Sequence, residues 1–306
     1  MSPARSSFMC PPGCLVDAAK PKRPPAGRHQ RGGGRHETSI AGHRPVTRRR
    51  AGVCPPARCW AHGTKVGVRA RSLHRLAVAL AAVRRCYGPT WGKFRNRTRP
   101  AVGNHEYETR GAGPYRDYFG TAAGPRGKGW YSYTAGAWHV VVLNANCGDV
   151  GCGRGSEQER WLRADLAAHP ARCTLAYWHQ ARLVSDDAHG NSPEVGIFWD
   201  DLYEAGADLV LAGHAHVYER LAPQTPAAKA DPAHGIREIV VGTGGVSHYG
   251  FGSVRPNSQV RNDDTFGVLK LTLHADSYDW NFVPAAGRTF KDSGSTACHG
   301  RPRLST

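Results

Sequence analysis

Apolar runs and polar turns alternate regularly only from about residue 87 onward. Within that part, three short runs are rich in β-branched and other apolar residues. Their length is that of a strand rather than a helix, so we predict that they are buried strands. The three runs are residues 138–143, 173–178 and 208–211.

Helical patterns separate these runs. Ser156 is followed three residues later by Glu159, which is the spacing of a capping box, so we predict a helix from there to about Ala168. A second helix is expected between Pro193, a residue type favoured in the first helical turn, and Gly206, which suits a helix end. Its inward side would carry Val195, Phe198, Trp199 and Leu202.

Strands predominate toward the C-terminus. We predict three of them in hairpin-like succession, over residues 236–241, 266–273 and 277–283. Because strands and helices alternate first and strands predominate later, the chain is predicted to form an α/β layered domain that ends in an antiparallel sheet.

The first quarter of the chain has a different texture. Residues 1–75 are rich in proline, arginine, glycine and histidine and show neither helical nor strand periodicity. Such a stretch buries too little apolar surface to offset the entropy lost on ordering, so we expect disorder, with at most a short helix over residues 73–85. The predicted division is a basic segment, residues 1–86, followed by a globular domain, residues 87–306.

Charge supports this division. The 306 residues carry a formal net charge of +17, but residues 1–86 hold 18 lysines and arginines against two carboxylates, and the remainder is nearly balanced. A basic segment suggests a nucleic-acid or anionic-surface binder. Its only aromatic residues are Phe8 and Trp60, too few for base stacking, so no specific nucleic-acid partner is expected. No apolar run reaches membrane-spanning length, so no membrane partner is expected either.

Four cysteines lie in the globular part. Cys147 and Cys152 flank a short loop that a disulfide could close, and a bridge between Cys173 and Cys298 is possible. An even number favours an oxidising, extracytoplasmic compartment, and four reduced, buried thiols are the alternative. No apolar segment follows the basic residues at the N-terminus, so no signal peptide is readable.

Polar clusters follow three apolar segments. Since ligand sites in open α/β sheets gather outside the carboxyl ends of strands, the clusters are expected to converge. Two histidines separated by one residue can point to the same side of an extended segment, and histidine is the commonest metal-ligating side chain. The clusters are Asn104-His105-Glu106 after residues 99–103, His179 after residues 173–178, and Gly213-His214-Ala215-His216 after residues 208–212.

Each signal taken singly also has an ordinary structural explanation. A lone histidine such as His179 is more often a hydrogen-bonded structural residue than a ligand, and Asn104 with His105 is compatible with a turn. His189, in the loop after residues 173–178, is a weaker candidate for facing a substrate. Residues 218–220 are expected to brace the loop before them. Residues 242–245 are expected to form a tight turn, because no Lys-Ser/Thr follows to make a phosphate loop.

Three blocks together carry a family resemblance: Gly103-Asn104-His105-Glu106, Tyr177-Trp178-His179 and Gly213-His214-Ala215-His216-Val217-Tyr218-Glu219-Arg220. In order and spacing they resemble successive signature blocks of the calcineurin-like metallophosphoesterases, and the last is most similar to the purple acid phosphatase branch. The resemblance covers about residues 87–300. It implies a two-layered β-sandwich flanked by helices, a dinuclear metal centre, a phosphomonoester substrate and secretion.

The resemblance also implies roles for individual residues. Asn104, through its amide oxygen, would bind one metal together with His179 and His214, and His216 would bind the other. His105 would be catalytic, protonating the leaving group or holding the phosphate. Two metal ions clamp a phosphate and generate hydroxide near neutral pH. Imidazole and oxygen ligands suit iron, zinc or manganese.

Part of the family pattern is missing. Two earlier blocks, an Asp-x-His-like element and a Gly-Asp element that supplies the bridging carboxylate, belong upstream of Asn104, where this sequence has only Asp17 and Glu37 in other contexts. Asp149 follows a glycine but lies downstream. The domain is therefore expected to lack its usual N-terminal β-α-β portion, and His216 to lack partner ligands.

One hypothesis explains both the missing blocks and the composition. Arginine, proline, alanine and glycine have GC-rich codons, so residues 1–86 would be a frameshifted or misassembled start; a genuine basic extension is the alternative. The predicted function is that of a metal-dependent phosphoesterase of the acid-phosphatase type with severely reduced activity. The competing functions are a catalytically inactive remnant that binds at most one metal, and nucleic-acid binding through residues 1–86.

Overall fold

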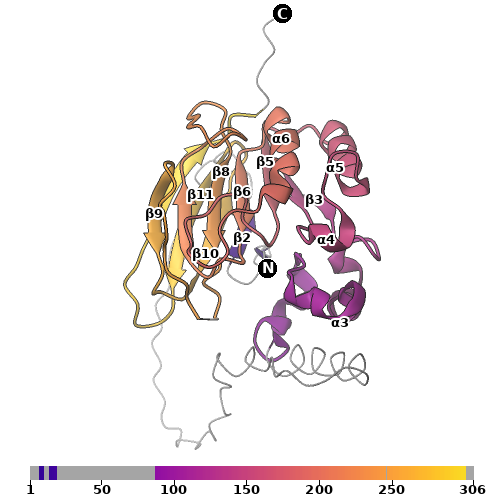
Figure 1. Cartoon of the computed structure of the whole chain (residues 1–306), viewed down its shortest axis with the longest axis horizontal. Helices are drawn as coiled ribbons and strands as arrows, with labels where there is room; N and C mark the ends of the chain where they lie inside the picture. The colour runs from indigo at the N-terminus through magenta and orange to yellow at the C-terminus, as the bar shows by residue number, and fades with distance from the viewer. Residues whose placement is uncertain (1–6, 10–13, 19–86, 246, 301–306) are drawn as a thin grey trace, which may run out of the picture.

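The computed structural model describes residues 7–9, 14–18, 87–245 and 247–300, and these form two packed β-sheets with helices on one side (Figure 1). The predicted α/β fold, a β-sandwich flanked by helices, is confirmed. The remainder of the basic segment, including the expected helix over residues 73–85, lies outside the described residues, so the division at residue 86 stays a prediction.

The larger sheet has seven strands in the order β3-β4-β5-β6-β8-β7-β9. Its central strands β4, β5, β6 and β8 are parallel, and the outer pairs are antiparallel. The strands are β3 (Tyr131–Ala135), β4 (Trp138–Val142), β5 (Cys173–Tyr177), β6 (Leu209–Ala212), β7 (Tyr218–Leu221), β8 (Arg237–Val241) and β9 (Ser258–Asn262).

The smaller sheet has five strands in the order β1-β2-β10-β11-β12. Strand β2 runs parallel to β10, and the other pairs are antiparallel. The strands are β1 (Ser7–Met9), β2 (Cys14–Ala18), β10 (Gly267–Leu273), β11 (Ser277–Pro284) and β12 (Ser293–Ala297).

The two main helices cover the face of the larger sheet that points away from the smaller one (Figure 1). Helix α5 (Glu157–Ala168) begins as predicted, since the Ser156 side chain accepts a hydrogen bond from the backbone of Glu159. Helix α6 (Gly196–Glu204) follows the 3-10 turn η6 (Pro193–Val195). Shorter elements are α3 (Gly113–Phe119), α4 (Cys147–Val150), η2 (Trp91–Arg97), η3 (His105–Glu108), η4 (Arg110–Ala112) and η5 (Gly120–Ala123).

Strand alternation divides the core into two layers. In β4, Trp138, Val140 and Val142 pack between the sheets, whereas Val141 packs under the helices with the α6 residues Phe198 and Leu202. Because the central strands are buried on both faces, they read in the sequence as continuous apolar runs. This explains why β4, β5 and β6 were predictable.

The expected succession of three C-terminal hairpin strands is partly wrong. Strands β10 and β11 do pair antiparallel, but residues 236–241 become β8 of the other sheet, between β6 and β7. Every residue of β8 is buried, which suits the interior of the larger sheet rather than a half-exposed hairpin. The strand that follows β8 in sequence order, β9, is therefore not its pairing partner; β8 pairs with β6 and β7 instead.

Two further expectations change with the structure. Residues 99–103, before Asn104, form no strand. In the stretch that showed no strand period, β1 and β2 are strands, with β2 pairing along the edge of β10. Edge pairing depends on backbone groups and needs no side-chain pattern.

Both disulfides form: Cys147 with Cys152, and Cys173 with Cys298. The alternative of four reduced thiols is therefore wrong for this structure. None of the helices in the described residues combines the length and apolar character that crossing a membrane requires.

Candidate metal centre

The loops after β5 and β6 bring His179 and His214 together. Backbone hydrogen bonds between these two segments continue past the ends of β5 and β6. The Trp178 N–H donates to the Leu211 carbonyl at 3.2 Å, and the Gly213 N–H donates to the His179 carbonyl at 2.9 Å. Both histidines thus leave the sheet at the same edge, the carboxyl end of parallel strands.

Three potential ligand atoms meet at this edge. His179 Nε2 lies 2.9 Å from Asn104 Oδ1 and 3.2 Å from His214 Nδ1. Asn104 comes from a different segment, 75 residues away in sequence. The structure therefore brings together the asparagine and the two histidines that the family resemblance assigned to one metal.

The electrostatics of the cluster keep these imidazoles neutral. Burial is the main cause that lowers the pKa of His179 to about 3, and the neighbouring His214 is the second. Burial is also the main cause that lowers the pKa of His214 to about 4, and the neighbouring His189 and His216 lower it further. Burial also lowers the pKa of His216. Near neutral pH the ring nitrogens can therefore offer lone pairs, as metal binding requires.

The backbone at His214 is strained. Its φ of 60° lies in the left-handed region, which non-glycine residues adopt uncommonly. A tight turn accompanies it, with the Ala215 N–H 2.7 Å from the Gly213 carbonyl oxygen. Strain of this kind persists only where surrounding structure enforces it, and it clusters at functional sites.

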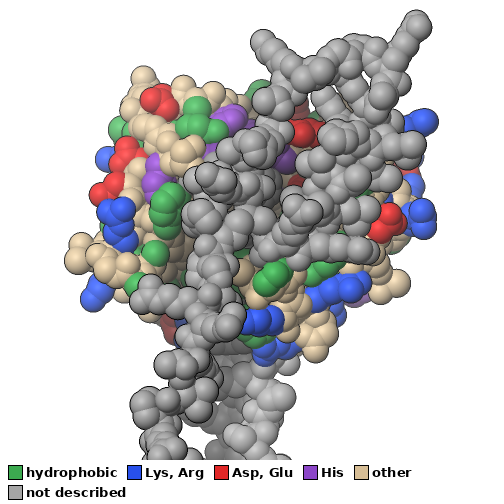
Figure 2. All heavy atoms as spheres, turned by 90° about the horizontal axis from the view of Figure 1, so that it is seen from below, with side chains coloured by type: hydrophobic (Ala, Val, Ile, Leu, Met, Phe, Trp, Pro, Cys, Tyr) green, Lys and Arg blue, Asp and Glu red, His purple; other side chains and the backbone are tan. Residues whose placement is uncertain are grey.

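His216 lies beside this cluster but has different neighbours. Its Nδ1–H donates to the Ser247 carbonyl at 2.7 Å, which directs lone-pair character to Nε2. Its ring stacks on Tyr249 at a centroid distance of 4.2 Å. Histidine side chains come to the surface in the upper part of the face that Figure 2 shows.

His105 is exposed, and its Nδ1–H donates to Glu108 Oε1 at 2.9 Å. It is close enough to contribute to the lowered pKa values of His179, His214 and His216. Its position at the rim of the cluster is compatible with contact to a substrate.

The structure gives His189 a more central place than sequence reasoning did. Its ring lies 4.1 Å from that of His214 and 4.9 Å from that of Tyr249, between centroids. The buried Asp186 holds it there, because the carboxylate accepts the N–H groups of Ala188, His189 and Gly190 and lies 3.4 Å from His189 Nδ1. No local motif marks Asp186 or Tyr249 in the sequence.

Tyrosine hydroxyls hold the segment before Asn104, which forms no strand. Tyr115 and Tyr131 donate to the Pro100 carbonyl, and Tyr177 donates to the Arg99 carbonyl. Further along, a Cβ on Gly103 would come within 3.0 Å of the His179 ring. These contacts fix the segment so that Asn104 lies next to His179.

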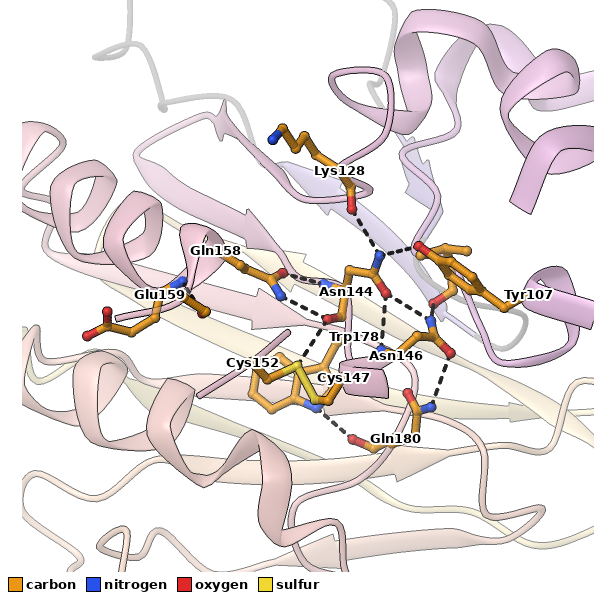
Figure 3. Close-up of a disulfide and its surroundings, with 12 residues drawn as sticks. Tyr107, Lys128, Asn144, Asn146, Cys147, Cys152, Gln158, Glu159, Trp178 and Gln180 are labelled. Carbon is orange, nitrogen blue, oxygen red and sulfur yellow. Dashed lines mark hydrogen bonds between the residues drawn. A yellow bond between two sulfur atoms is a disulfide. The ribbon is translucent and has the colours of Figure 1, made fainter. Parts of the chain in front are cut away.

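The loop after β4 is joined by a hydrogen bond to Gln180, the residue that follows His179 (Figure 3). The Asn144 side-chain amide donates to the Tyr107 hydroxyl and the Lys128 carbonyl, and its oxygen accepts from the Asn146 side chain at 2.9 Å. The Gln180 side chain donates to Asn146 Oδ1 at 3.4 Å. The Cys147–Cys152 disulfide anchors this loop. A cavity of about 290 Å³ lies here, lined in part by Asn146, Asp149, Gln180 and Glu194.

The residues after His216 connect the site to the rest of the fold. Glu219 accepts hydrogen bonds from the backbone and hydroxyl of Ser185, in the loop that carries His189. Tyr218 and Arg220 both bond Asp292. These residues therefore brace the loop that carries His189 and the segment around Asp292, whereas the sequence led us to expect bracing of the loop directly before them.

No carboxylate of the described residues forms a three-ligand metal group with the cluster histidines. In the part of the chain that the structure describes, the groups of three histidine, cysteine or carboxylate ligands close enough to share an ion lie elsewhere. Asp186 acts on His214, raising its pKa against the larger effects of burial and of neighbouring histidines. Its oxygens, however, are already engaged by three backbone N–H groups.

About half of the chain is similar in sequence to known proteins, among them a purple acid phosphatase. It is 32% identical over 206 residues to an uncharacterised protein of Mycobacterium tuberculosis, an alignment that covers 52% of this chain and 39% of that protein. It is 31% identical over 178 residues to purple acid phosphatase 15 of Arabidopsis thaliana, covering 51% of this chain and 32% of the relative. No family model matches.

A structural comparison agrees on the fold. A purple acid phosphatase from yellow lupin (Lupinus luteus) seeds matches with a TM-score of 0.59 at 18% identity, covering 69% of this chain and 45% of that one. The chain thus spans less than half the length of these curated relatives and of the lupin enzyme.

Proposed function

We propose that this chain, a calcineurin-like metallophosphoesterase of the purple acid phosphatase-like branch, binds one metal ion through Asn104, His179 and His214 and hydrolyses phosphomonoesters only weakly. The observation that carries the proposal is the meeting of His179 Nε2 with Asn104 Oδ1 at 2.9 Å and His214 Nδ1 at 3.2 Å.

This donor set fits a metal ion. One amide oxygen and two imidazoles kept neutral by burial are ligands suited to iron, zinc or manganese. A bound ion would supply Lewis acidity and lower the pKa of a coordinated water. The chain's part is to hold the three donors in place, through the paired loops after β5 and β6 and the tyrosine-anchored segment before Asn104.

Other residues of the site would handle the substrate. His105, oriented by Glu108, stands at the exposed rim, where an imidazole can hold a phosphate oxygen or give a proton to the leaving group. His189, held by Asp186 against His214, would approach from the other side. The cavity beside Gln180 would receive the organic part of a phosphomonoester.

The residues described do not fit a second ion. His216 is oriented as a ligand, but no carboxylate among them joins it in a three-ligand group. Two cations held only by neutral ligands repel each other, whereas a bridging carboxylate would offset that charge. Without the two-ion clamp on the phosphate, transition-state stabilisation of several kcal/mol is lost, which corresponds to orders of magnitude in rate.

The cellular setting follows from the disulfides. Two bridges in a domain of this size persist best in an oxidising compartment, so we place the protein outside the cytoplasm. The nucleic-acid hypothesis concerns residues 1–86, of which the structure describes only β1 and β2, and it gains no support.

The test combines metal analysis with turnover. The full chain would be loaded separately with manganese, iron or zinc, and hydrolysis of p-nitrophenyl phosphate measured. We expect one ion per chain at the Asn104 site, and a turnover orders of magnitude below that of an intact purple acid phosphatase. His179→Ala should abolish that binding, whereas His234→Ala, a histidine of another loop, should preserve it. Two ions per chain with a turnover like the intact enzyme's would refute the proposal.

The catalytically inactive remnant is the second candidate, favoured because no carboxylate within the described residues joins His216 in a three-ligand group. The same measurements separate the two. Metal-dependent turnover that His179→Ala removes identifies a weak enzyme, and binding of one ion with no turnover identifies a remnant.

A further inference from the structure

We propose that His139, Asp165 and His169 form a separate binding site for a zinc-like divalent cation. This site belongs neither to the predicted phosphoesterase centre nor to its substrate cavity. The observation behind it is the convergence of two imidazoles on the two oxygens of one buried carboxylate.

The geometry of the cluster is compact. His139 Nε2 lies 2.8 Å from Asp165 Oδ2, and His169 Nδ1 lies 3.2 Å from Asp165 Oδ1 and 2.9 Å from the Asp165 backbone carbonyl oxygen. One ligand atom from each residue lies within 4.8 Å of the others. The two rings are nearly parallel, 16° apart, with centroids separated by 5.1 Å. The three donors therefore border a common volume.

This arrangement is close to what zinc requires. Ligands about 2.0–2.2 Å from a tetrahedral zinc ion stand roughly 3.3–3.6 Å apart, so a small outward movement would admit the ion. His169 can make that movement, because it follows the last turn of α5 and its side chain is 55% exposed. Water would fill the remaining position on the exposed side.

Neighbouring protein groups fix the Asp165 carboxylate in an orientation suited to binding a cation. Ser132 donates to Asp165 Oδ1 at 2.8 Å, a supporting bond that fixes the orientation of the ligand. The Asp165 side chain is only 7% exposed, so its carboxylate is held among protein groups rather than in solvent.

The site is remote from the His179 cluster. His139 pairs with Thr174, near the beginning of β5, whereas His179 follows the end of that strand. At about 3.3 Å per residue, five residues of strand separate the two levels by roughly 16 Å. One ion cannot serve both groups, so the two sites can be measured independently.

An ion here would act structurally. It would link the C-terminal end of α5 to β4, and through Ser132 to β3, the edge strand of the larger sheet. Because the ion binds the folded arrangement, it would stabilise the native state by an amount that grows with the logarithm of its concentration above the dissociation constant.

The test uses the full-length, untagged chain with His179→Ala and His214→Ala in place, so that the other metal site is removed. Cobalt, a spectroscopic substitute for zinc, would be titrated while visible absorption is followed, and zinc would then displace it. We expect one equivalent to bind with tetrahedral-type absorption. Adding His169→Gln should weaken binding at least tenfold, and Ser132→Ala should weaken it by about tenfold. His234→Ala is the matched control and should change nothing.

Thermal melting provides a second readout. Zinc should raise the melting temperature of the parent but not of the His169→Gln variant, whose exposed substitution leaves the fold intact. If a folded parent binds no cobalt or zinc at concentrations up to about a millimolar, the cluster is only a hydrogen-bonded ion pair and the proposal fails. Binding that survives both His169→Gln and Asp165→Asn overturns it as well.

Discussion

Gly242 lies directly against the peptide of Ala215. A Cβ built on Gly242 would come within 1.8 Å of the Ala215 carbonyl oxygen, and the Gly242 N–H donates to the Val217 carbonyl at 3.0 Å. The segment after β8 thus supports the loop that carries His214 and His216. Gly242 permits this close approach because it has no side chain.

Gly242→Ala should therefore displace this loop. Because backbone cannot yield as a flexible side chain can, we expect metal affinity at the Asn104 site to fall at least tenfold while the sheets remain folded. Metal titration with circular dichroism measures both. Gly148→Ala is the control, since its Cβ would meet open space. Unchanged affinity in Gly242→Ala would show that the loop does not depend on this contact.

Asp186→Asn should loosen the turn that holds His189. The carboxylate accepts three backbone N–H groups, and an amide presents its own N–H₂ to some of them, so the turn loses hydrogen bonds. We expect amide hydrogen exchange over residues 186–190 to accelerate about tenfold or more, corresponding to about 1–3 kcal/mol. Asp187→Asn, whose side chain lies beside Gly250, should leave exchange at the parent rate. Equal protection in both variants would contradict the assignment.

Stability should depend on pH through Glu238. This carboxyl is fully buried; burial raises its pKa to about 8, although it accepts backbone N–H groups of Arg182 and Leu183. The folded state therefore holds a proton that the unfolded chain releases near pH 4.5. Its stabilising contribution is complete below pH 4.5 and is lost as the pH rises to about 8, by at most about 1.4 kcal/mol per pH unit.

Two histidines act in the opposite direction in the metal-free protein. His179 and His214 have lowered pKa values, so their contribution is present above pH 6.5 and is lost as the pH falls toward 4 and 3. Urea unfolding from pH 4 to 9 should therefore show a maximum near pH 6.5. Glu238→Gln should flatten the decline between pH 6.5 and 8 and keep the acid limb. A decline of the same slope in Glu238→Gln would assign it to other groups.

Ser156→Ala should destabilise the fold modestly. The Ser156 hydroxyl accepts the Glu159 N–H at the start of α5, and Glu159 in turn accepts the Gly155 N–H. Loss of such a cap costs about 1 kcal/mol, measured as a shift in the urea midpoint at constant slope. Ser192→Ala provides the comparison, because Ser192 precedes η6 without a side-chain cap bond. Equal effects of the two substitutions would mean that capping is not the cause.

Local sequence patterns determined much of the framework. The continuous apolar runs specified β4, β5 and β6, because a strand buried on both faces has no polar face to interrupt it. The spacing of Ser156 and Glu159 specified the start of α5, because capping is a contact between residues three apart. The sequence did not predict the short strands β7 and β9. Each has only four or five residues, and polar residues among them obscure any alternation of apolar and polar positions.

The sequence alone also identified Asn104, His179, His214 and His216 as one candidate set, through the order of three motifs. Only the tertiary structure decided which of them meet. His179 reaches Asn104 across 75 residues because tyrosine hydroxyls fix one chain and parallel pairing fixes the other. The same packing gave β8 its partner and set Asp186 behind His189, since contacts between distant segments depend on how whole layers pack rather than on any local pattern.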